Sequence, residues 1–132
     1  MQKNHAPEHP ALSVLRDTFT IYKLSPDASI PEEIRNCDFY NVSKSAEELS
    51  VVCPEQFEVQ STHSSPDWKC IKVKGPLDFD LTGILAGISA ILAQANISIF
   101  AISTFNTDYI LVPKQALDEA CSVLMQAGYK FE

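Results

Sequence analysis

The stretch of sequence that decides the fold covers residues 82–112 and reads TGILAGISAILAQANISIFAISTFNTDYILV. Apolar residues in its first part recur at spacings of three and four, which predicts one apolar face of a helix. These residues are Ile84, Ile88, Ile91, Leu92 and Ala95. Residues 98–105 are then rich in β-branched and aromatic side chains. Residues 109–112 have a similar composition and follow Asn106-Thr107, a pattern typical of a tight β-hairpin. The stretch therefore predicts a helix and two paired strands, with the polar side chains at the junctions.

The composition of the chain is that of an ordinary globular protein. It has 132 residues, of which 45% are hydrophobic and 20% are charged, so we expect one domain or two very small units that share a core. There are 17 acidic and 10 basic residues, a formal net charge of -7. Because a protein that binds the phosphate backbone needs a basic face, this charge argues against a nucleic-acid partner.

Membrane and metal-binding classes are also disfavoured. No apolar run approaches the roughly 20 residues of a membrane span, and the start of the chain lacks the apolar core of a signal peptide, so we expect a cytoplasmic protein without a membrane partner. The four cysteines are widely separated, and the three histidines form no ligand pattern. We therefore expect no metal and no cofactor, and small apolar roles for the thiols in a reducing compartment.

The first half of the chain predicts short strands and loops. Residues 1–12 have little pattern and are expected to form a mobile tail. Residues 18–24 alternate and read as a strand, and Pro31 begins a short helical turn. Residues 39–42 and 49–52 read as a strand pair, and the polar residues 57–67 as a loop or linker.

The second half predicts the order strand, helix, strand, strand, helix, strand. Residues 68–74 alternate lysine with apolar side chains, a pattern typical of a strand with one face exposed to solvent. After the helix and hairpin, Pro113 stands at the favoured first position of a second helix, and Gly128 closes that helix. Residues 129–131 read as a last short strand. Two crossover helices on one face of an antiparallel sheet give an α+β, ferredoxin-like fold.

A short internal sequence repeat suggests two related units. Residues 48–56, ELSVVCPEQ, resemble residues 108–115, DYILVPKQ, in an acidic residue, a strand and a helix start with proline. The repeat predicts a degenerate first unit at residues 13–65 and a second unit at residues 66–132. A single echo of this length can also arise by chance.

Residues 75–86 and 103–112 together resemble the ACT domain, and more narrowly the small tandem-ACT proteins that include the ACT repeats of cytosolic arginine sensors. Gly83 stands at the N-terminus of the first helix, which we call its mouth, and the Ser-Thr-x-x-x-Asp-Tyr pattern spans the hairpin. The chain departs from many ACT domains in carrying Thr82 where they have proline and Asn96 where they often have glycine. The resemblance implies regulation by a small ligand, usually an amino acid, held beside the first helix at an interface between ACT units. It implies no catalytic apparatus.

The helix mouth suits the carboxylate of an amino acid. The amides of Gly83, Ile84 and Leu85 lack helical partners and carry partial positive charge, and a glycine lets an anion approach the backbone closely. The hydroxyl of Thr82 either caps the helix or contacts the ligand. The alternative is that Thr82 only caps and Gly83 only relieves crowding.

The hairpin suits the ammonium group of the same ligand. Pairing of the strands brings Ser103 and Thr104 close to Asp108, whose carboxylate can accept a charge-assisted hydrogen bond from an ammonium or a guanidinium. The alternative is that Asp108 bonds its own backbone as a turn residue. Asp78 and Asp80 lie on the connection to the helix without a histidine or nucleophile beside them, and Asp80 is the better ligand candidate.

We therefore expect an amino-acid-binding regulatory module that forms a homodimer and is not an enzyme. The expected ligand-binding residues are Asp80, Leu81, Thr82, Gly83, Ile84, Ser103, Thr104, Phe105 and Asp108. One alternative is a ligand-free module for protein interaction or oligomerisation, in which the same surface only joins subunits. A third reading is an enzyme that uses Cys53 or Cys70 with His63.

Overall fold

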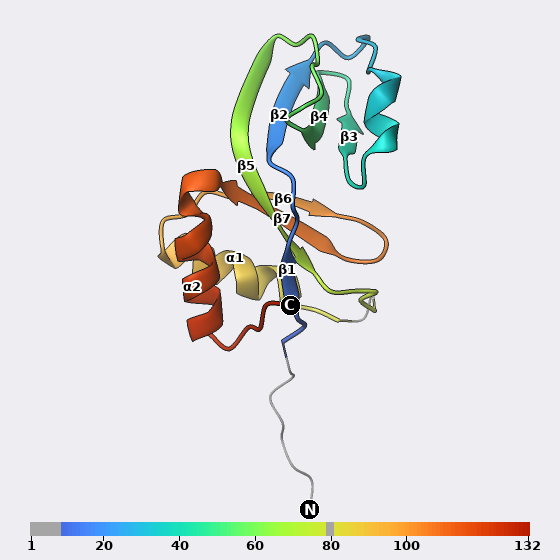
Figure 1. The fold of residues 1–132 in the computed structure, drawn as a ribbon. Helices are drawn as coiled ribbons and strands as arrows, with labels where there is room; N and C mark the ends of the chain where they lie inside the picture. Colours follow the sequence, from blue (N-terminus) through green and yellow to red (C-terminus); the bar gives the residue numbers. More distant parts are fainter. Residues whose placement is uncertain (1–8, 79–80) are drawn as a thin grey trace, which may run out of the picture.

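The described residues of the protein, 9–78 and 81–132 in a computed structural model, form a mixed α+β fold with one antiparallel sheet (Figure 1). The strands follow the order β3-β4-β2-β5-β7-β6, and β1 pairs with β5 off this path. The elements are β1 (Leu12–Val14), β2 (Phe19–Leu24), η1 (Glu32–Asn36), β3 (Asn41–Lys44), β4 (Leu49–Pro54), β5 (His63–Val73), α1 (Ile84–Gln94), β6 (Phe100–Ser103), β7 (Asp108–Pro113), η2 (Lys114–Ala116) and α2 (Leu117–Gln126), where η marks a short 3-10 helix.

One long strand, β5, joins two lobes. Its first part pairs with β2 and belongs to an N-terminal lobe with η1, β3 and β4, whereas its second part pairs with β7 and β1 and belongs to a C-terminal lobe with both α-helices. The loop predicted at residues 57–67 is therefore wrong from His63 onward. Ser64 and Ser65 pair with β2 although they are polar, because both side chains are exposed to solvent. The expected unit boundary between residues 65 and 66 falls inside this continuous strand.

The beginning and the end of the described chain meet beside β5. Leu12 is 1% exposed and pairs with Val73, so the tail predicted to reach residue 12 is wrong at its end. The amide of Leu12 donates to the carbonyl of Lys130 at 2.8 Å, and Glu132 donates to Leu12 at 2.7 Å. The strand predicted at residues 129–131 reduces to one parallel bridge between Leu12 and Phe131, because β1 occupies the position beside β5.

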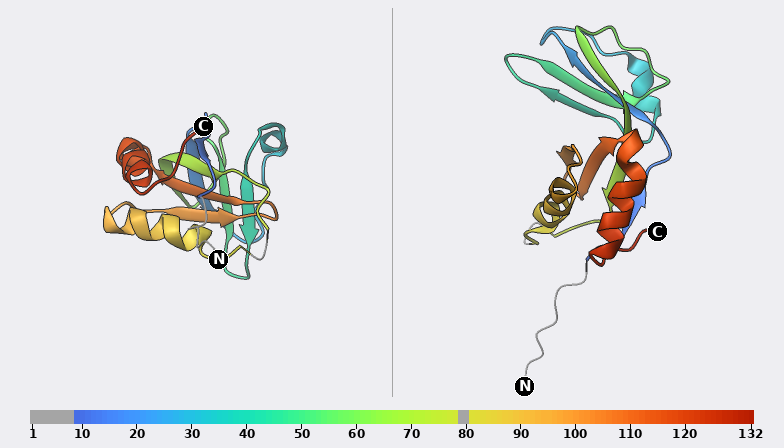
Figure 2. Two further views of the ribbon diagram at one scale, coloured as in Figure 1. Left: turned by 90° about the horizontal axis from the view of Figure 1, so that it is seen from below. Right: turned by 90° about the vertical axis from the view of Figure 1, so that its left-hand side faces the viewer.

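Both α-helices lie side by side on one face of the C-terminal lobe (Figure 2). The predicted first helix is confirmed, with Ile88 and Leu92 fully buried against β5 and β7. The predicted second helix is confirmed after one 3-10 turn that follows Pro113. Gly128 has a φ of 101° just beyond the helix, and Tyr129 donates to Leu124 at 3.0 Å, so this glycine ends the helix as expected.

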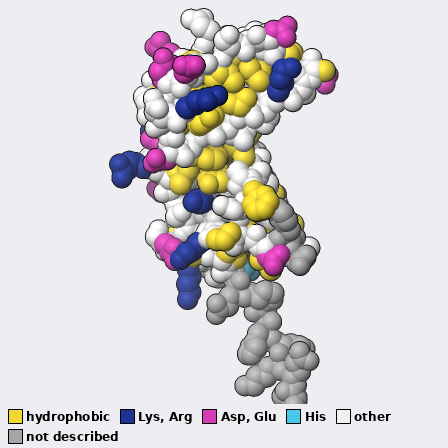
Figure 3. Space-filling view, turned by 90° about the vertical axis from the view of Figure 1, so that its right-hand side faces the viewer, with side chains coloured by type: hydrophobic (Ala, Val, Ile, Leu, Met, Phe, Trp, Pro, Cys, Tyr) yellow, Lys and Arg dark blue, Asp and Glu magenta, His cyan; other side chains and the backbone are white. Residues whose placement is uncertain are grey.

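The other face of the same strands packs against the N-terminal lobe. A cluster of buried side chains lies there: Phe19, Val52, Cys70, Ile102 and Leu111. A separate cluster, which contains Ile34, lies within the N-terminal lobe. Figure 3 shows a hollow between the two lobes with hydrophobic side chains along it. The lobes thus share a strand and an apolar contact, which fixes one relative to the other.

Candidate functional site

A surface pocket of about 310 Å³ lies between the start of α1 and the β6–β7 hairpin. It is lined by seven of the nine residues expected to bind a ligand: Leu81, Gly83, Ile84, Ser103, Thr104, Phe105 and Asp108. Thr82 does not line it, and Asp80 lies outside the described residues. Residues that the ligand prediction did not include also line the pocket: Leu77, Asp78, Leu85, Ala86, Asn106 and Thr107. The structure therefore brings the helix mouth and the hairpin to one place.

Gly83 is required by the backbone conformation at the helix start. Its φ is 83°, in the left-handed region, and an added Cβ would meet no atom within 4 Å. The alternative that this glycine relieves crowding is therefore wrong. The N-cap residue Gly83 makes no side-chain cap hydrogen bond, and the first bond of the helix runs from the amide of Gly87 to the carbonyl of Gly83 at 2.8 Å. The amides of residues 84–86 thus begin the helix without intrahelical partners.

The hairpin orients its polar side chains through its own hydrogen bonds. Ser103 and Asp108 are directly paired, and the hydroxyl of Ser103 donates to the Asp108 carboxylate at 2.5 Å. Asp108 therefore bonds a side chain on the neighbouring strand, which differs from the turn bond of the alternative interpretation. The remaining lone pairs of this carboxylate are the acceptors that a cation at this position would use.

The turn of the hairpin is one residue earlier than predicted. The amide of Thr104 donates to the carbonyl of Thr107 at 2.8 Å, so Phe105 and Asn106 are the central residues. Thr107 is only 5% exposed, and its hydroxyl donates to the carbonyl of Val73 at 2.5 Å. Because this buried bond holds Thr107 against β5, the turn lies at the two residues before Thr107.

Gly75 explains how the hairpin reaches the segment that leads to α1. A Cβ at residue 75 would lie 2.8 Å from the carbonyl oxygen of Asn106 and 3.0 Å from the Cβ of Thr107. The amide of Leu77 donates to that same carbonyl of Asn106 at 2.7 Å. The tip of the hairpin therefore packs directly on the connection between β5 and α1, which closes one side of the pocket.

The pocket has an acidic side and an apolar rim. Asp78 and Asp108 line it, and none of the described lining residues is a lysine or arginine. Leu81 is 55% exposed and Phe105 is 78% exposed at its edge. A ligand there would meet carboxylates, helix amides without intrahelical partners and apolar surface together.

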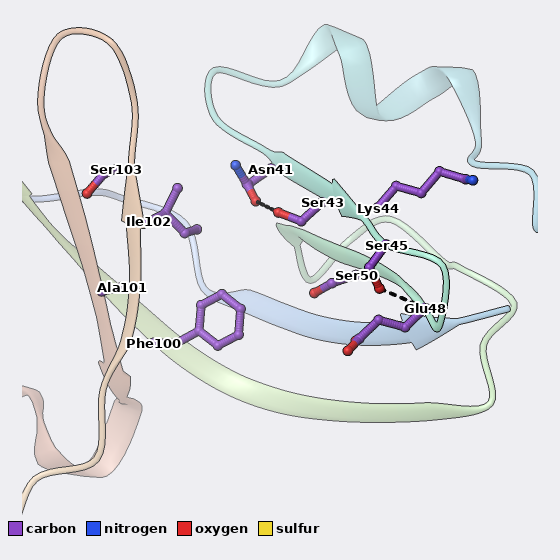
Figure 4. Close-up of a pocket in the computed structure, with 10 residues that line it drawn as sticks. All are labelled: Asn41, Ser43, Lys44, Ser45, Glu48, Ser50, Phe100, Ala101, Ile102 and Ser103. Carbon is purple, nitrogen blue, oxygen red and sulfur yellow. Dashed lines mark hydrogen bonds between the residues drawn. The ribbon is translucent and has the colours of Figure 1, made fainter. Parts of the chain in front are cut away.

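A second pocket, of about 460 Å³, lies between the two lobes (Figure 4). Phe100 and Ile102 point into it from β6, and Ser43 and Ser50 face them from β3 and β4. Sequence patterns did not find it, because its walls come from strands about sixty residues apart. Its lining mixes hydroxyl and apolar side chains with Asn41, Lys44 and Glu48.

The cysteines do not form a reactive site. Burial raises the pKa of Cys53 to about 11 and that of Cys70 to about 12, so both thiols keep their protons at neutral pH. His63 begins β5, seven residues from Cys70, which is roughly 23 Å along a strand. The cysteine and histidine enzyme is therefore unsupported. Within residues 9–78 and 81–132, no cluster of His, Cys, Asp and Glu could hold a metal ion, and no helix is long and apolar enough to cross a membrane.

A family model described as the ACT domain matches residues 63–126. Residues 63–126 form an ACT domain. A second family model, described as an N-terminal domain, matches residues 17–59. ACT domains are regulatory modules that bind amino acids and are not catalytic. The family therefore assigns this general role to the chain and no enzymatic reaction to the ACT domain.

Two of the proteins that are similar to this chain differ in how much of it they cover. The human cytosolic arginine sensor for mTORC1 subunit 1 is 43% identical over 60 residues, which is 45% of this chain and 18% of the sensor. The chain thus matches less than a fifth of the length of that relative. A crystal structure of an Agobacterium tumefaciens protein is 32% identical with a TM-score of 0.86, covering 96% of this chain and 94% of that one.

An aspartate kinase of Clostridium acetobutylicum shares the fold at low sequence identity. The two are 12% identical with a TM-score of 0.66, and the match covers 93% of this chain and 36% of the kinase. At this identity the similarity supports the ACT fold alone.

Proposed function

We propose that the chain is an amino-acid-binding regulatory module and that its ligand lies at the mouth of α1. The observation that carries the proposal is that one pocket is lined both by the start of α1 and by Asp108. A free amino acid offers a carboxylate and an ammonium, and these two surfaces are their chemical complements.

The proposed pose follows from the chemistry of each wall. The ligand carboxylate faces the amides of residues 84–86, where the helix dipole favours an anion. The ammonium faces Asp108, which Ser103 holds in place. The ligand side chain lies against Leu81 and Phe105 at the rim. Because Asp78 also lines the pocket, a zwitterionic or cationic amino acid fits better than an acidic one.

The finer architecture belongs to the same proposal. We infer that residues 66–132 form a ferredoxin-like ACT unit in which β1 takes the place of the last strand beside β5. We infer that residues 13–65 form a degenerate second unit, in which the five-residue η1 replaces a full helix and no helix follows β4 before β5.

The proposed assembly is a cytoplasmic homodimer. Leu81 and Phe105 expose large apolar side chains around the pocket, and a second copy that covers them would bury this surface and enclose the ligand. Burial of apolar area at an interface favours association. A bound ligand would then stabilise one packing of the copies if it binds that packing more tightly.

A thermal-shift and calorimetric screen of the twenty amino acids tests the ligand proposal. At a concentration 100 times its Kd, a ligand should stabilise the folded state by about 2.7 kcal/mol. The Asp108→Asn variant should lose this stabilisation, whereas Asp27→Asn, a change in a turn of the other lobe, should keep it. No stabilisation by any amino acid at millimolar concentration would count heavily against the proposal.

The exposed apolar rim also supports a second candidate, a ligand-free module for oligomerisation. In that case Phe105→Glu should dissociate the dimer in sedimentation experiments, and added amino acids should change neither the dimer nor its stability. Asp108→Ala should likewise leave both properties nearly unchanged. A dimer that tightens with an amino acid and loosens in Asp108→Ala would exclude this candidate.

A further inference from the structure

A charged pocket of about 310 Å³ lies at the junction of the two lobes, away from the mouth of α1. Its walls come from the segment between β1 and β2, the segment before β3, and the strands β5 and β7. The lining residues are Leu15, Arg16, Asp17, Asp38, Phe39, Lys72 and Tyr109. None of them lines the pocket at the mouth of α1.

The strand side of this pocket is held by aromatic contacts. Lys72 pairs directly with Tyr109 across β5 and β7, and its ammonium lies 5.8 Å from the centre of the Tyr109 ring. Phe39, from the N-terminal lobe, stacks on the same ring with 4.1 Å between centroids. Lys72 is thus a half-buried residue whose ammonium lies over the Tyr109 ring.

The segment between β1 and β2 is fixed by hydrogen bonds to β5. The ammonium of Lys69 donates to the carbonyls of Arg16 and Asp17, at 2.8 and 3.0 Å. The amide of Leu15 donates to the carbonyl of Cys70 at 2.9 Å. The backbone beneath the side chains of Arg16 and Asp17 is therefore preformed.

The pocket contains two charges of each sign that do not neutralise one another by direct pairing. Among residues 9–78 and 81–132, no carboxylate lies within 4.0 Å of the Arg16 guanidinium or the Lys72 ammonium. Burial raises the pKa of the Cys37 thiol, and the carboxylates of Asp17 and Asp38 raise it further. Both carboxylates therefore lie close enough to the Cys37 thiol to act on it electrostatically.

We infer that this pocket binds a small zwitterion, with its amine toward Asp17 and Asp38 and its carboxylate toward Arg16 and Lys72. A molecule with both charges can satisfy the two sets of side chains at once, and charge-assisted hydrogen bonds are the strong ones. A molecule with one charge satisfies only half of them. Because both lobes supply walls, an occupied pocket holds the lobes together.

Titration of the full chain followed by two-dimensional amide NMR tests this inference with three matched probes. L-leucine carries both charges, isocaproate carries only the carboxylate, and isoamylamine carries only the amine. L-leucine should move the amide signals of residues 15–17, 38–39 and 72 in a saturable way. Each analogue with one charge should bind roughly tenfold more weakly or worse, the loss expected for one charged hydrogen-bond pair.

Charge-removing variants locate the binding. Lys72→Gln, Asp38→Asn and the exposed Arg16→Gln should each raise the Kd of L-leucine roughly tenfold. Lys23→Gln and Asp27→Asn make the same changes elsewhere in the N-terminal lobe and should leave that Kd unchanged. If Lys72→Gln does not fold, Arg16→Gln and Asp38→Asn still decide the result.

Three outcomes would overturn the inference. They are no saturable change at residues 15–17, 38–39 and 72, equal binding of L-leucine and its singly charged analogues, or unchanged binding in the variants. Changes confined to residues 83–86 and 103–108 would also overturn it while supporting the site at the mouth of α1. Changes confined to the junction would leave that other site unsupported, so the two proposals fail separately.

Discussion

Phe39 stacks on Tyr109 across the boundary between the lobes, with 4.1 Å between the ring centroids and 19° between the ring planes. Phe39 also meets Phe19 edge-on, with centroids 5.9 Å apart and an interplanar angle of 81°. One side chain thus contacts β2 of one lobe and β7 of the other. This contact is one reason why the lobes behave as a single packed structure.

Replacing Phe39 by alanine should lower the free energy of unfolding by about 2–3 kcal/mol, because a half-buried aromatic side chain loses its packing and both ring contacts. Urea denaturation followed by fluorescence of Trp68 measures the change. Met125→Ala is the matched control. Since Met125 is 53% exposed, that variant should change stability by no more than about 0.5 kcal/mol. Equal effects of the two variants would contradict the packing argument.

Gly83→Ala should lower the free energy of unfolding by about 1–2 kcal/mol, because a non-glycine residue is strained in the left-handed region. No clash contributes, since an added Cβ would meet no atom within 4 Å. Gly83→Asn should be milder, because asparagine adopts this conformation more readily. Chemical denaturation of both variants checks the order. A larger loss for asparagine than for alanine would point to a steric cause instead.

Thr107→Val should lower the free energy of unfolding by about 1–3 kcal/mol, because the carbonyl of Val73 loses a buried donor. Thr62→Val is the matched control. Its hydroxyl donates to Lys23 at 2.9 Å in an exposed position, where water can replace it. Thermal unfolding of both variants gives the comparison, and a neutral Thr107→Val would show that the carbonyl finds another partner.

Cys70 should make the protein less stable as the pH rises from about 9 to 12. Burial raises the pKa of this thiol from 9.0 to about 12, so above pH 9 the unfolded chain loses a proton that the folded chain keeps. The free energy of unfolding should then fall by up to about 1.4 kcal/mol per pH unit from this group. Denaturation between roughly pH 8 and pH 12, which spans the window between the two pKa values, measures the slope.

The contribution of Cys70 is isolated by comparing slopes. Cys70→Ala should flatten the pH dependence relative to the natural chain, whereas Ser122→Ala, an exposed change, should leave it as it was. Parallel curves for Cys70→Ala and the natural chain would mean that the thiol titrates normally in the folded state.

Local patterns predicted the C-terminal lobe well because its elements repeat with clear periods. The apolar spacing that includes Ile88 and Leu92 is the buried face of α1, and Gly128 marks the end of α2 by its backbone conformation. The first part of β5 escaped prediction, since Ser64 and Ser65 are exposed and resemble a loop. The strand β1 was not predicted, because three residues show too little periodicity to distinguish a strand from a tail.

The sequence patterns indicated individual residues of the candidate pocket, but not how those residues are arranged in space. Gly83 and Asp108 were identified from a helix mouth and a hairpin, together with the family resemblance. The roles of Leu77 and Asn106 depend on the close approach at Gly75, which no local period encodes. The pocket at the lobe junction joins Arg16, Asp38 and Lys72, and only the sheet order brings these together.

The meeting of Leu12 with Lys130 and Glu132 has a consequence for biosynthesis. A ribosome makes the amino end first, and domains commonly begin to fold in that order. Here β1 needs residues 71–73 for its ladder and residues 130–132 for its other edge. The strand β1 is therefore made before the other described strands, but it acquires all of its partners only once residues 130–132 have been made.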